Sequence, residues 1–144
     1  MVKSYRICDP SEFVKIFPYL KTQPAVVLMF GDMGAGKTTL VREFMRWLGF
    51  KGRVKSPTFT YEIVYEDMKI SHVDLYRISQ DTADILDEIL SRLDEGYLVF
   101  VEWPSRLGEN IKDIFSNYPV IEVYIDIVDE NCRDIKLVVD SNES

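Results

Sequence analysis

The sequence predicts an α/β fold in which helices flank a central sheet that contains both parallel and antiparallel strands. Two continuous apolar runs, Ala25–Phe30 and residues 97–101, are typical of central strands that are covered on both faces. Segments with apolar residues at helical spacing follow or separate these runs. Two pairs of short strands at 61–74 and 120–139 indicate antiparallel hairpins, so the sheet should be mixed.

The first expected elements are a short strand at residues 5–8 and a helix that begins just after it. Asp9 suits the N-cap of that helix and Pro10 suits its first position. Pro18 lies inside the apolar pattern of the helix, so the helix should kink or end there.

The rest of the chain is expected to form, in order, a helix that ends near Gly49, a loop, an antiparallel strand pair, a helix, a buried strand, a short helix and a closing hairpin. The expected bounds are 40–48, 53–60, 61–65 with 69–74, 81–93, 97–101, 110–115, and 120–127 with 134–139. We expect residues 1–140 to form one domain and residues 141–144 to be a polar tail.

Composition excludes several classes of function. The net charge of −7 argues against independent binding to nucleic acid, because neutralising phosphates supplies most non-specific affinity. No apolar run approaches the roughly 18 residues that suggest a membrane span, and the N-terminus lacks the apolar centre of a signal peptide. We therefore expect a cytoplasmic protein that does not bind membranes.

The cysteines and the histidine limit the metal chemistry. Cys8 and Cys132 lie near opposite ends of the chain, and in a cytoplasmic protein we expect two reduced, structural thiols. They are too few for a four-ligand zinc site. His72 is the single histidine, which excludes a histidine-rich metal site.

The segment GDMGAGKT at residues 31–38 fits the phosphate-binding pattern G-x-x-x-x-G-K-[ST] at every fixed position. It follows a buried strand and opens a helix, which is the context that the pattern requires. Its glycines allow successive N–H groups to form an anion nest, and Lys37 and Thr38 should reach the β- and γ-phosphates and Mg²⁺. We expect a nucleoside triphosphate to contact Gly31, Asp32, Met33, Gly34, Ala35, Gly36, Lys37, Thr38 and Thr39.

Two carboxylates stand at the ends of expected strands. Glu102 follows an apolar strand and Asp74 ends the strand KISHVD. In nucleotide-hydrolysing proteins such a carboxylate serves Mg²⁺ or orients the attacking water. We therefore expect Lys37, Asp74 and Glu102 to be catalytic and Thr38, Asp74 and Glu102 to serve the metal, with the division between the two acids open.

Other polar and aromatic residues carry weaker signals. Thr58 and Thr60 in SPTFT have the hydroxyls of a segment that senses the γ-phosphate, although an ordinary loop fits equally well. Trp103, beside Glu102, is a candidate partner contact or a core residue. His72 is more often a packed strand residue than a catalyst. None of the arginines at 53, 77 and 106 is distinguished by its spacing.

Four motifs in the same order, GDMGAGKTTL, SPTFT, HVDLYR and VFVEWPSRL, resemble those of the bacterial TsaE ATPases. The resemblance implies a single-domain P-loop NTPase fold and a cytoplasmic ATPase, weak alone, that uses ATP and Mg²⁺. It also implies a role in forming threonylcarbamoyladenosine in tRNA with the TsaD–TsaB pair, so that tRNA is reached only indirectly. It matches Lys37, Thr38, Asp74 and Glu102 to the nucleotide site. The segment 78–96 departs from the family because it lacks the glycine-containing E-x-L-G-like stretch that many relatives have there.

Two other classes remain as alternatives. A small-molecule kinase would need an acceptor pocket and an arginine-rich lid, and the sequence has no segment that resembles such a lid. A GTP-dependent switch usually carries N/T-K-x-D, which is absent from this sequence.

We expect the protein to be a monomer when alone, because no strong apolar stripe remains after the expected helices and strands have been packed.

Overall fold

Parallel strands form the centre of a mixed sheet in the computed structural model, which describes residues 1–57, 61–78 and 82–139. Within these residues the sheet has seven strands in the order β1-β7-β6-β2-β5-β4-β3. The strands are β1 (Val2–Ile7), β2 (Ala25–Phe30), β3 (Glu62–Tyr65), β4 (Ile70–Asp74), β5 (Leu98–Glu102), β6 (Val120–Ile127) and β7 (Arg133–Val139). The parallel centre and antiparallel edges confirm the predicted α/β sheet.

The strand β2 lies between β5 and β6, parallel to both. The side chains from Ala25 to Met29 are completely buried or nearly so, which explains the continuous apolar run. On the far side of β5, β4 is also parallel, with Asp74 in register with Glu102. Because the carboxyl ends of parallel strands meet at one edge, the segments that follow β2, β4 and β5 lie near one another.

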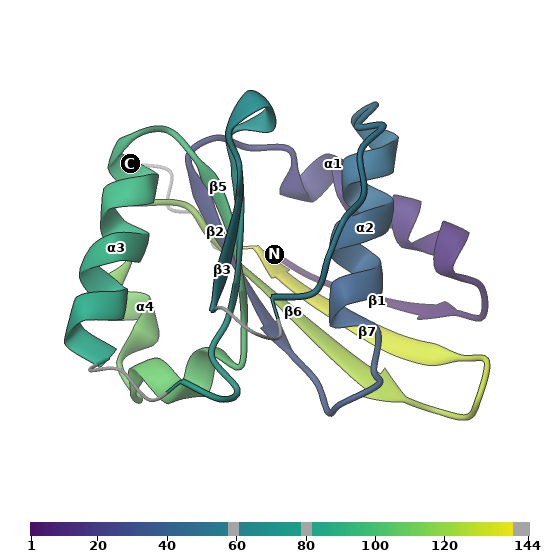
Figure 1. The fold of residues 1–144 in the computed structure, drawn as a ribbon. Coiled ribbons are helices and arrows are strands. Elements are labelled where there is room, and N and C mark those ends of the chain that lie inside the picture. Colours follow the sequence, from purple (N-terminus) through teal and green to yellow (C-terminus); the bar gives the residue numbers. More distant parts are fainter. Residues whose placement is uncertain (58–60, 79–81, 140–144) are drawn as a thin grey trace.

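Helices cover both faces of the sheet (Figure 1). One face carries α1 (Phe17–Leu20), α2 (Lys37–Trp47) and the 3₁₀ helix η1 (Pro10–Lys15). The other carries α3 (Thr82–Asp94), α4 (Ile111–Ile114) and the 3₁₀ helix η3 (Pro104–Leu107), while η2 (Glu66–Met68) joins β3 to β4. The side chains of β2 alternate between the two cores, since Val27 and Met29 face the first and Val26 and Leu28 the second.

The helix α2 is held against the sheet by a stripe of apolar residues. Leu40, Val41, Phe44 and Met45 are completely buried, and each contributes on the order of 1.5–3 kcal/mol to folding. The Phe44 ring meets the rings of Phe17 and Phe100 edge-on at 5.3 and 5.5 Å. This packing fixes the N-terminal end of α2 at the edge of the sheet where β2 ends.

The N-terminal helix differs from the prediction. Residues 10–15 form 3₁₀ turns, and a separate α-helical turn begins at Phe17. Asp9 is the predicted cap, since its carboxylate accepts the Ser11 N–H at 2.9 Å. Pro18 lies in the first turn of α1, where no N–H donor is needed, so the proline opens a new helix instead of ending a longer one.

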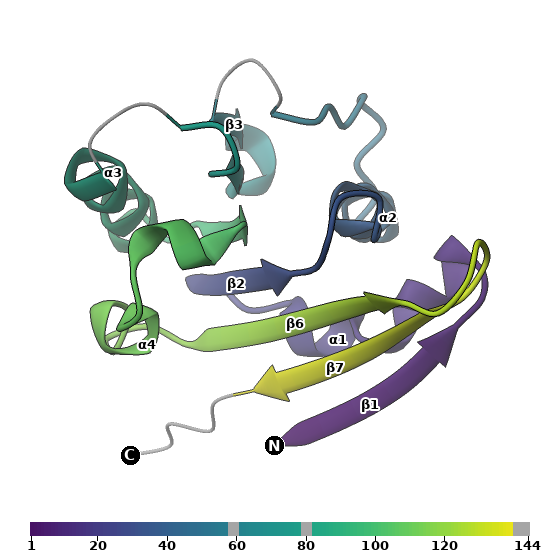
Figure 2. The ribbon, with the colours of Figure 1, turned by 90° about the horizontal axis from the view of Figure 1, so that it is seen from below.

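The expectation of two reduced cysteines is wrong in this structure. The edge strand β1 pairs antiparallel with β7 from Val2 opposite Val138 to Ile7 opposite Arg133 (Figure 2). This pairing brings Cys8 beside Cys132, and the two form a disulfide across a sequence separation of 124. The distance along the chain concealed the pair, because only the position of β1 at the edge of the sheet brings the two ends together.

Two sequence predictions cannot be compared with the structure. The polar tail at 141–144 lies outside the described residues, as do Thr58 and Thr60. Among the residues that are described, we find no helix with the length and hydrophobicity to traverse a lipid bilayer.

Candidate functional site

A glycine-rich loop at residues 31–36 connects β2 to α2. Gly34 and Gly36 have φ angles of 81° and 117°, which side chains rarely allow. Gly31 is required for a different reason, because a Cβ there would lie 2.8 Å from the Ile125 carbonyl oxygen of β6. The loop therefore wraps closely around the N-terminal end of α2, whose first N–H groups have no partner within the helix and favour an anion.

The amine of Lys37 lies at the mouth of this loop. The residue is 5% exposed, and its Nζ donates to the Gly31 carbonyl oxygen at 2.5 Å. Burial lowers the pKa of Lys37, while the charges of Glu102, Asp74 and Asp32 oppose that shift. A cation in this setting is poorly hydrated and can exchange its carbonyl contact for an incoming phosphate oxygen.

Glu102 is the centre of a small polar network. Its side chain is buried, and its Oε2 accepts the Thr38 hydroxyl at 3.1 Å. The same oxygen lies 2.5 Å from Nε2 of His72, which is completely buried on β4. The structure thus joins the first turn of α2, β4 and β5 through one carboxylate.

Asp74 lies beside Glu102 at the end of the neighbouring strand. Its Oδ1 accepts the Tyr76 N–H at 3.0 Å. Burial raises the pKa of Asp74, and the negative charge of Glu102 raises it further. Two neighbouring carboxylates with a hydroxyl therefore form a site that gains from a bound cation.

These oxygen donors fit Mg²⁺, which binds one or two carboxylates and keeps several waters or phosphate oxygens. In the described ranges no group of three or more His, Cys, Asp or Glu side chains forms a complete metal site. A cation held by Thr38, Asp74 and Glu102 would therefore complete its shell with water and with oxygens of a bound ligand.

Trp103 follows Glu102 and has a φ angle of 58°, in a region that bulky residues rarely adopt. Its ring centroid lies 3.8 Å from the Lys37 amine and 4.9 Å from the Tyr76 ring. The side chain is only partly buried, so it belongs to the site as well as to the edge of the core.

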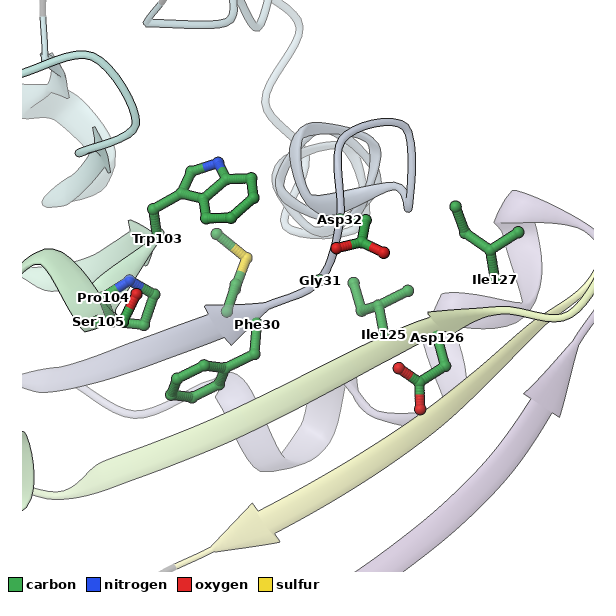
Figure 3. Close-up of a pocket in the computed structure, with 10 residues that line it drawn as sticks. Phe30, Gly31, Asp32, Trp103, Pro104, Ser105, Ile125, Asp126 and Ile127 are labelled. Atoms are coloured by element: carbon green, nitrogen blue, oxygen red, sulfur yellow. The ribbon is translucent and has the colours of Figure 1, made fainter.

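Beside the start of the glycine-rich loop is a pocket of about 200 Å³ (Figure 3). Its walls come from the ends of β2 and β6 and from the segment after β5. The lining residues are Met29, Phe30, Gly31, Asp32, Trp103, Pro104, Ser105, Ile125, Asp126 and Ile127. The pocket thus shares Gly31 and Asp32 with the loop, and Trp103 with the Lys37 contact.

The other residues that the sequence predicted for the glycine-rich loop differ in their exposure to solvent. Asp32, Met33 and Gly34 are exposed on the loop, with Met33 62% exposed. Ala35 is buried beneath it, and Thr39 is half-buried in the first turn of α2. The residues at 31–39 therefore form a continuous backbone around the end of α2, with the Lys37 amine on the Gly31 carbonyl oxygen and the Thr38 hydroxyl on Glu102.

Two residues enter the site that the sequence did not single out for it. His72 was interpreted mainly as a packed residue, although its alternation with Asp74 on one face of β4 was a signal. Arg133 donates to the carbonyl oxygens of Ala35 and Gly34 at 2.9 and 3.2 Å. No spacing signal reveals Arg133, because it lies almost a hundred residues after the loop.

The arginines considered from the sequence occupy other surroundings. Arg106 donates to the Leu75 carbonyl oxygen at 3.2 Å. Arg77 lies over the exposed Tyr76 ring at 5.8 Å, and Arg53 is exposed.

Comparisons with known proteins identify the family of this chain. The model of the family described as "Threonylcarbamoyl adenosine biosynthesis protein TsaE" matches residues 6–135. The chain is 34% identical over 137 residues to the tRNA threonylcarbamoyladenosine biosynthesis protein TsaE of Haemophilus influenzae, with 91% of this chain and 81% of that protein covered. It is 34% identical over 122 residues to the protein of the same name from Rickettsia felis, with 83% of this chain and 68% of that protein covered.

A solved structure supports the same assignment. The crystal structure of Bacillus subtilis YdiB superimposes with a TM-score of 0.71 and 26% sequence identity. The superposition covers 99% of this chain and 88% of that one. The family match over most of the chain and the similarity of the fold lead to one conclusion: this chain belongs to the TsaE family of tRNA threonylcarbamoyladenosine biosynthesis proteins.

Proposed function

We propose that this protein is a Mg²⁺-dependent ATPase that assists the formation of threonylcarbamoyladenosine in tRNA together with TsaD and TsaB. The observation that carries the proposal is the hydrogen bond from the Thr38 hydroxyl to the Glu102 carboxylate, beside the glycine-rich loop that ends at Lys37. A hydroxyl and an acid at this position are the groups that hold Mg²⁺ in proteins that hydrolyse nucleoside triphosphates.

The loop residues 31–39 bind the phosphates. Their backbone N–H groups and the positive end of α2 favour the negative charge, and Lys37 exchanges its contact with Gly31 for the β- and γ-phosphate oxygens. Bound Mg²⁺ supplies charge neutralisation at the transferred phosphoryl group.

The two carboxylates have separate tasks in this proposal. Glu102 touches Thr38, so it serves the metal shell. Asp74 stands on the next strand, with one oxygen used by the Tyr76 N–H, and orients the attacking water with the other. His72 holds Glu102 in place through its Nε2.

The partner dependence is proposed from the arginines of the described residues. Arg77 lies over the Tyr76 ring and Arg106 donates to the Leu75 carbonyl oxygen, so the contacts of both are with other parts of this chain and not with the glycine-rich loop. A group that neutralises the transition state and arrives from a partner accelerates phosphoryl transfer by about 10³–10⁵ in other systems. We therefore propose slow hydrolysis by the isolated protein and faster hydrolysis on TsaD–TsaB.

The tRNA is reached through that complex. The net charge of −7 disfavours direct contact with nucleic acid. The relatives are named for tRNA threonylcarbamoyladenosine biosynthesis, which supports a role beside the tRNA-binding partners.

The test is reconstitution with purified TsaD and TsaB over many cycles of tRNA modification. We expect this protein to raise the number of turnovers with ATP and Mg²⁺, but not with ADP or a non-hydrolysable ATP analogue. A pull-down with ATP, with ADP and without nucleotide should show that docking depends on the triphosphate. A protein that binds ATP and Mg²⁺ yet leaves the number of turnovers unchanged contradicts the proposal.

Two further experiments test the alternative functions, a GTP-dependent switch and a small-molecule kinase. Comparing ATP with GTP affinity in the presence of Mg²⁺ tests the GTP-switch alternative. Phosphate transfer to a metabolite faster than to water would instead support a kinase. We expect a preference for ATP and transfer to water.

A further inference from the structure

The turn between β6 and β7 reaches the outer side of the glycine-rich loop through Arg133. The Arg133 Nε donates to the Ala35 carbonyl oxygen at 2.9 Å, and one terminal nitrogen donates to the Gly34 carbonyl oxygen at 3.2 Å. The other terminal nitrogen donates to the carbonyl oxygens of Asp129 and Cys132 at 2.7 and 3.0 Å. One guanidinium thus joins two peptide units of the loop to two of the turn.

The turn that precedes Arg133 is held by several bonds. The Asp129 carboxylate accepts the N–H groups of Asn131 and Cys132 at 2.8 and 2.9 Å. Cys132 is joined to Cys8 by the disulfide, and Arg133 is in register with Ile7 of β1. Because the guanidinium of Arg133 is planar and the backbone beside it is fixed, the side chain loses little conformational entropy when it binds the loop.

The geometry of the peptide bond gives these contacts a consequence for phosphate binding. The Ala35 carbonyl and the Gly36 N–H belong to one planar trans peptide, so they point in opposite directions. Holding the Ala35 oxygen on the outer side directs the Gly36 N–H to the inner side of the loop. The left-handed conformation of Gly36, with a φ of 117°, permits this orientation.

The second contact stabilises the turn within the loop. The Gly34 carbonyl shares its peptide unit with the Ala35 N–H, which donates to the Asp32 carbonyl oxygen at 3.0 Å. Arg133 and Asp32 therefore hold the two ends of this peptide unit. With both peptide units fixed, the loop is prepared for an anion before one binds, which reduces the ordering cost of binding.

We propose that Arg133 is a positioning residue that holds the glycine-rich loop in its phosphate-binding form and so raises the affinity for the phosphate chain. The inference rests on the proposed function, since it assigns a role in the same site. Arg133 acts through the carbonyl oxygens of the loop backbone. The phosphates contact the inner side of the loop and do not touch Arg133.

The test compares three full-length variants. Arg133→Gln removes the charge and the fork, whereas Arg133→Lys keeps the charge but loses the fork. Arg6→Gln is the matched control, because Arg6 lies on β1 next to β7 and pairs with Asp134 at 2.8 Å on the surface. The substitution removes the same charge close to Arg133 without touching the glycine-rich loop. Calorimetry measures the affinity of each variant for ATP and for inorganic triphosphate, both with Mg²⁺.

We expect Arg133→Gln to weaken both ligands by the same factor, about tenfold, as for the loss of a hydrogen bond to a charged group. Arg133→Lys should recover less than half of that loss, and Arg6→Gln should bind as the wild type does. Unchanged affinity for triphosphate in Arg133→Gln would overturn the inference. Weaker affinity for ATP with unchanged affinity for triphosphate would also overturn it, because Arg133 would then contact the nucleoside. Full recovery of affinity in Arg133→Lys would overturn it too, because the charge alone would then explain the effect.

A second readout distinguishes failure of this inference from failure of the proposed function. In the ligand-free protein, the ¹H–¹⁵N signal of Gly36 should shift in Arg133→Gln and Arg133→Lys but stay in place in Arg6→Gln. An unshifted Gly36 signal in both Arg133 variants overturns the positioning role, whatever the protein binds. Wild-type protein that binds neither ATP nor triphosphate contradicts the proposed function instead.

Discussion

The imidazole Nε2 of His72 lies 2.5 Å from the Glu102 oxygen that also accepts the Thr38 hydroxyl. Both side chains are buried, so replacing His72 with alanine leaves a buried carboxylate without one of its partners. We expect His72→Ala to lower the free energy of unfolding by about 1–3 kcal/mol. It should also lower kcat for ATP hydrolysis more than ATP affinity, because Glu102 is no longer held beside Thr38.

Denaturant unfolding and steady-state kinetics measure the two effects. His72→Gln retains a donor of similar reach, so it should recover part of both losses. A His72→Ala variant with wild-type stability and kcat would contradict a role for the histidine in holding Glu102.

Lys37 gives the most direct test of nucleotide binding. Its amine contacts the Gly31 carbonyl and the Trp103 ring, and burial lowers its pKa. We expect Lys37→Ala to weaken ATP binding by at least about 100-fold, the effect of losing two charge-assisted contacts. The melting temperature should hardly change, because the substitution removes the desolvation cost of the buried ammonium together with its packing.

Isothermal titration with ATP and Mg²⁺ measures the binding, and Lys15→Ala is the control at an exposed ion pair. Retained hydrolysis in Lys37→Ala would contradict the site as a whole.

The division of labour between Asp74 and Glu102 predicts different losses. Glu102→Gln should weaken the Mg²⁺ dependence of ATP affinity, since Glu102 is the acid that touches Thr38. Asp74→Asn should keep ATP affinity but lower kcat by about 100-fold, within the range found for a group that handles a proton in the transition state. Titrating Mg²⁺ at fixed ATP, with single-turnover hydrolysis, separates the two. The reverse pattern would exchange the two assignments.

The disulfide predicts a dependence of stability on reduction. Cys8 and Cys132 close a loop across a separation of 124 residues. Restricting the unfolded chain in this way contributes about 2–4 kcal/mol. We therefore expect Cys8→Ser, Cys132→Ser and the reduced wild type to lose the same amount in denaturant unfolding. Two titratable thiols in the unfolded, unreduced protein would show that the bond is absent.

The raised pKa of Tyr124 predicts a loss of stability at alkaline pH. Burial and the hydrogen bond to the Glu122 carboxylate raise the pKa of Tyr124 from 10.0 to about 12. Because the folded value is the higher one, its contribution to stability is present below pH 10 and is lost as pH rises toward 12. Absorbance at alkaline pH should show a late phase of tyrosine ionisation, and Tyr124→Phe should reduce that phase. Glu122→Gln should lower the pKa only in part, since burial remains the larger cause.

The sequence predicted the centre of the fold because local chemistry is strong there. The apolar run at Ala25–Phe30 is typical of a strand covered on both faces, and the spacing of Leu40, Phe44 and Met45 is typical of a helix that buries one side. The two antiparallel hairpins, β3–β4 and β6–β7, were predicted correctly because strands joined by a short connection have few ways to pair with each other. The N-terminal helical segment breaks near Pro18 as predicted, but the break lies at Ile16, before the proline. The exact position was not predictable, because a proline in the first turn of a new helix and a proline inside a longer helix give the same sequence pattern.

For the site, the sequence by itself determined which residues have the chemistry: the loop at residues 31–38 and the strand-end acids Asp74 and Glu102. Only the tertiary structure decided their neighbours. The register of β4 with β5 placed Asp74 beside Glu102, and packing of β4 brought His72 onto the same carboxylate. The pairing of β1 with β7 joined Cys8 to Cys132 and brought Arg133 to the loop. Contacts between residues about a hundred positions apart leave no periodic pattern, because they depend on strand order in the sheet and not on local sequence.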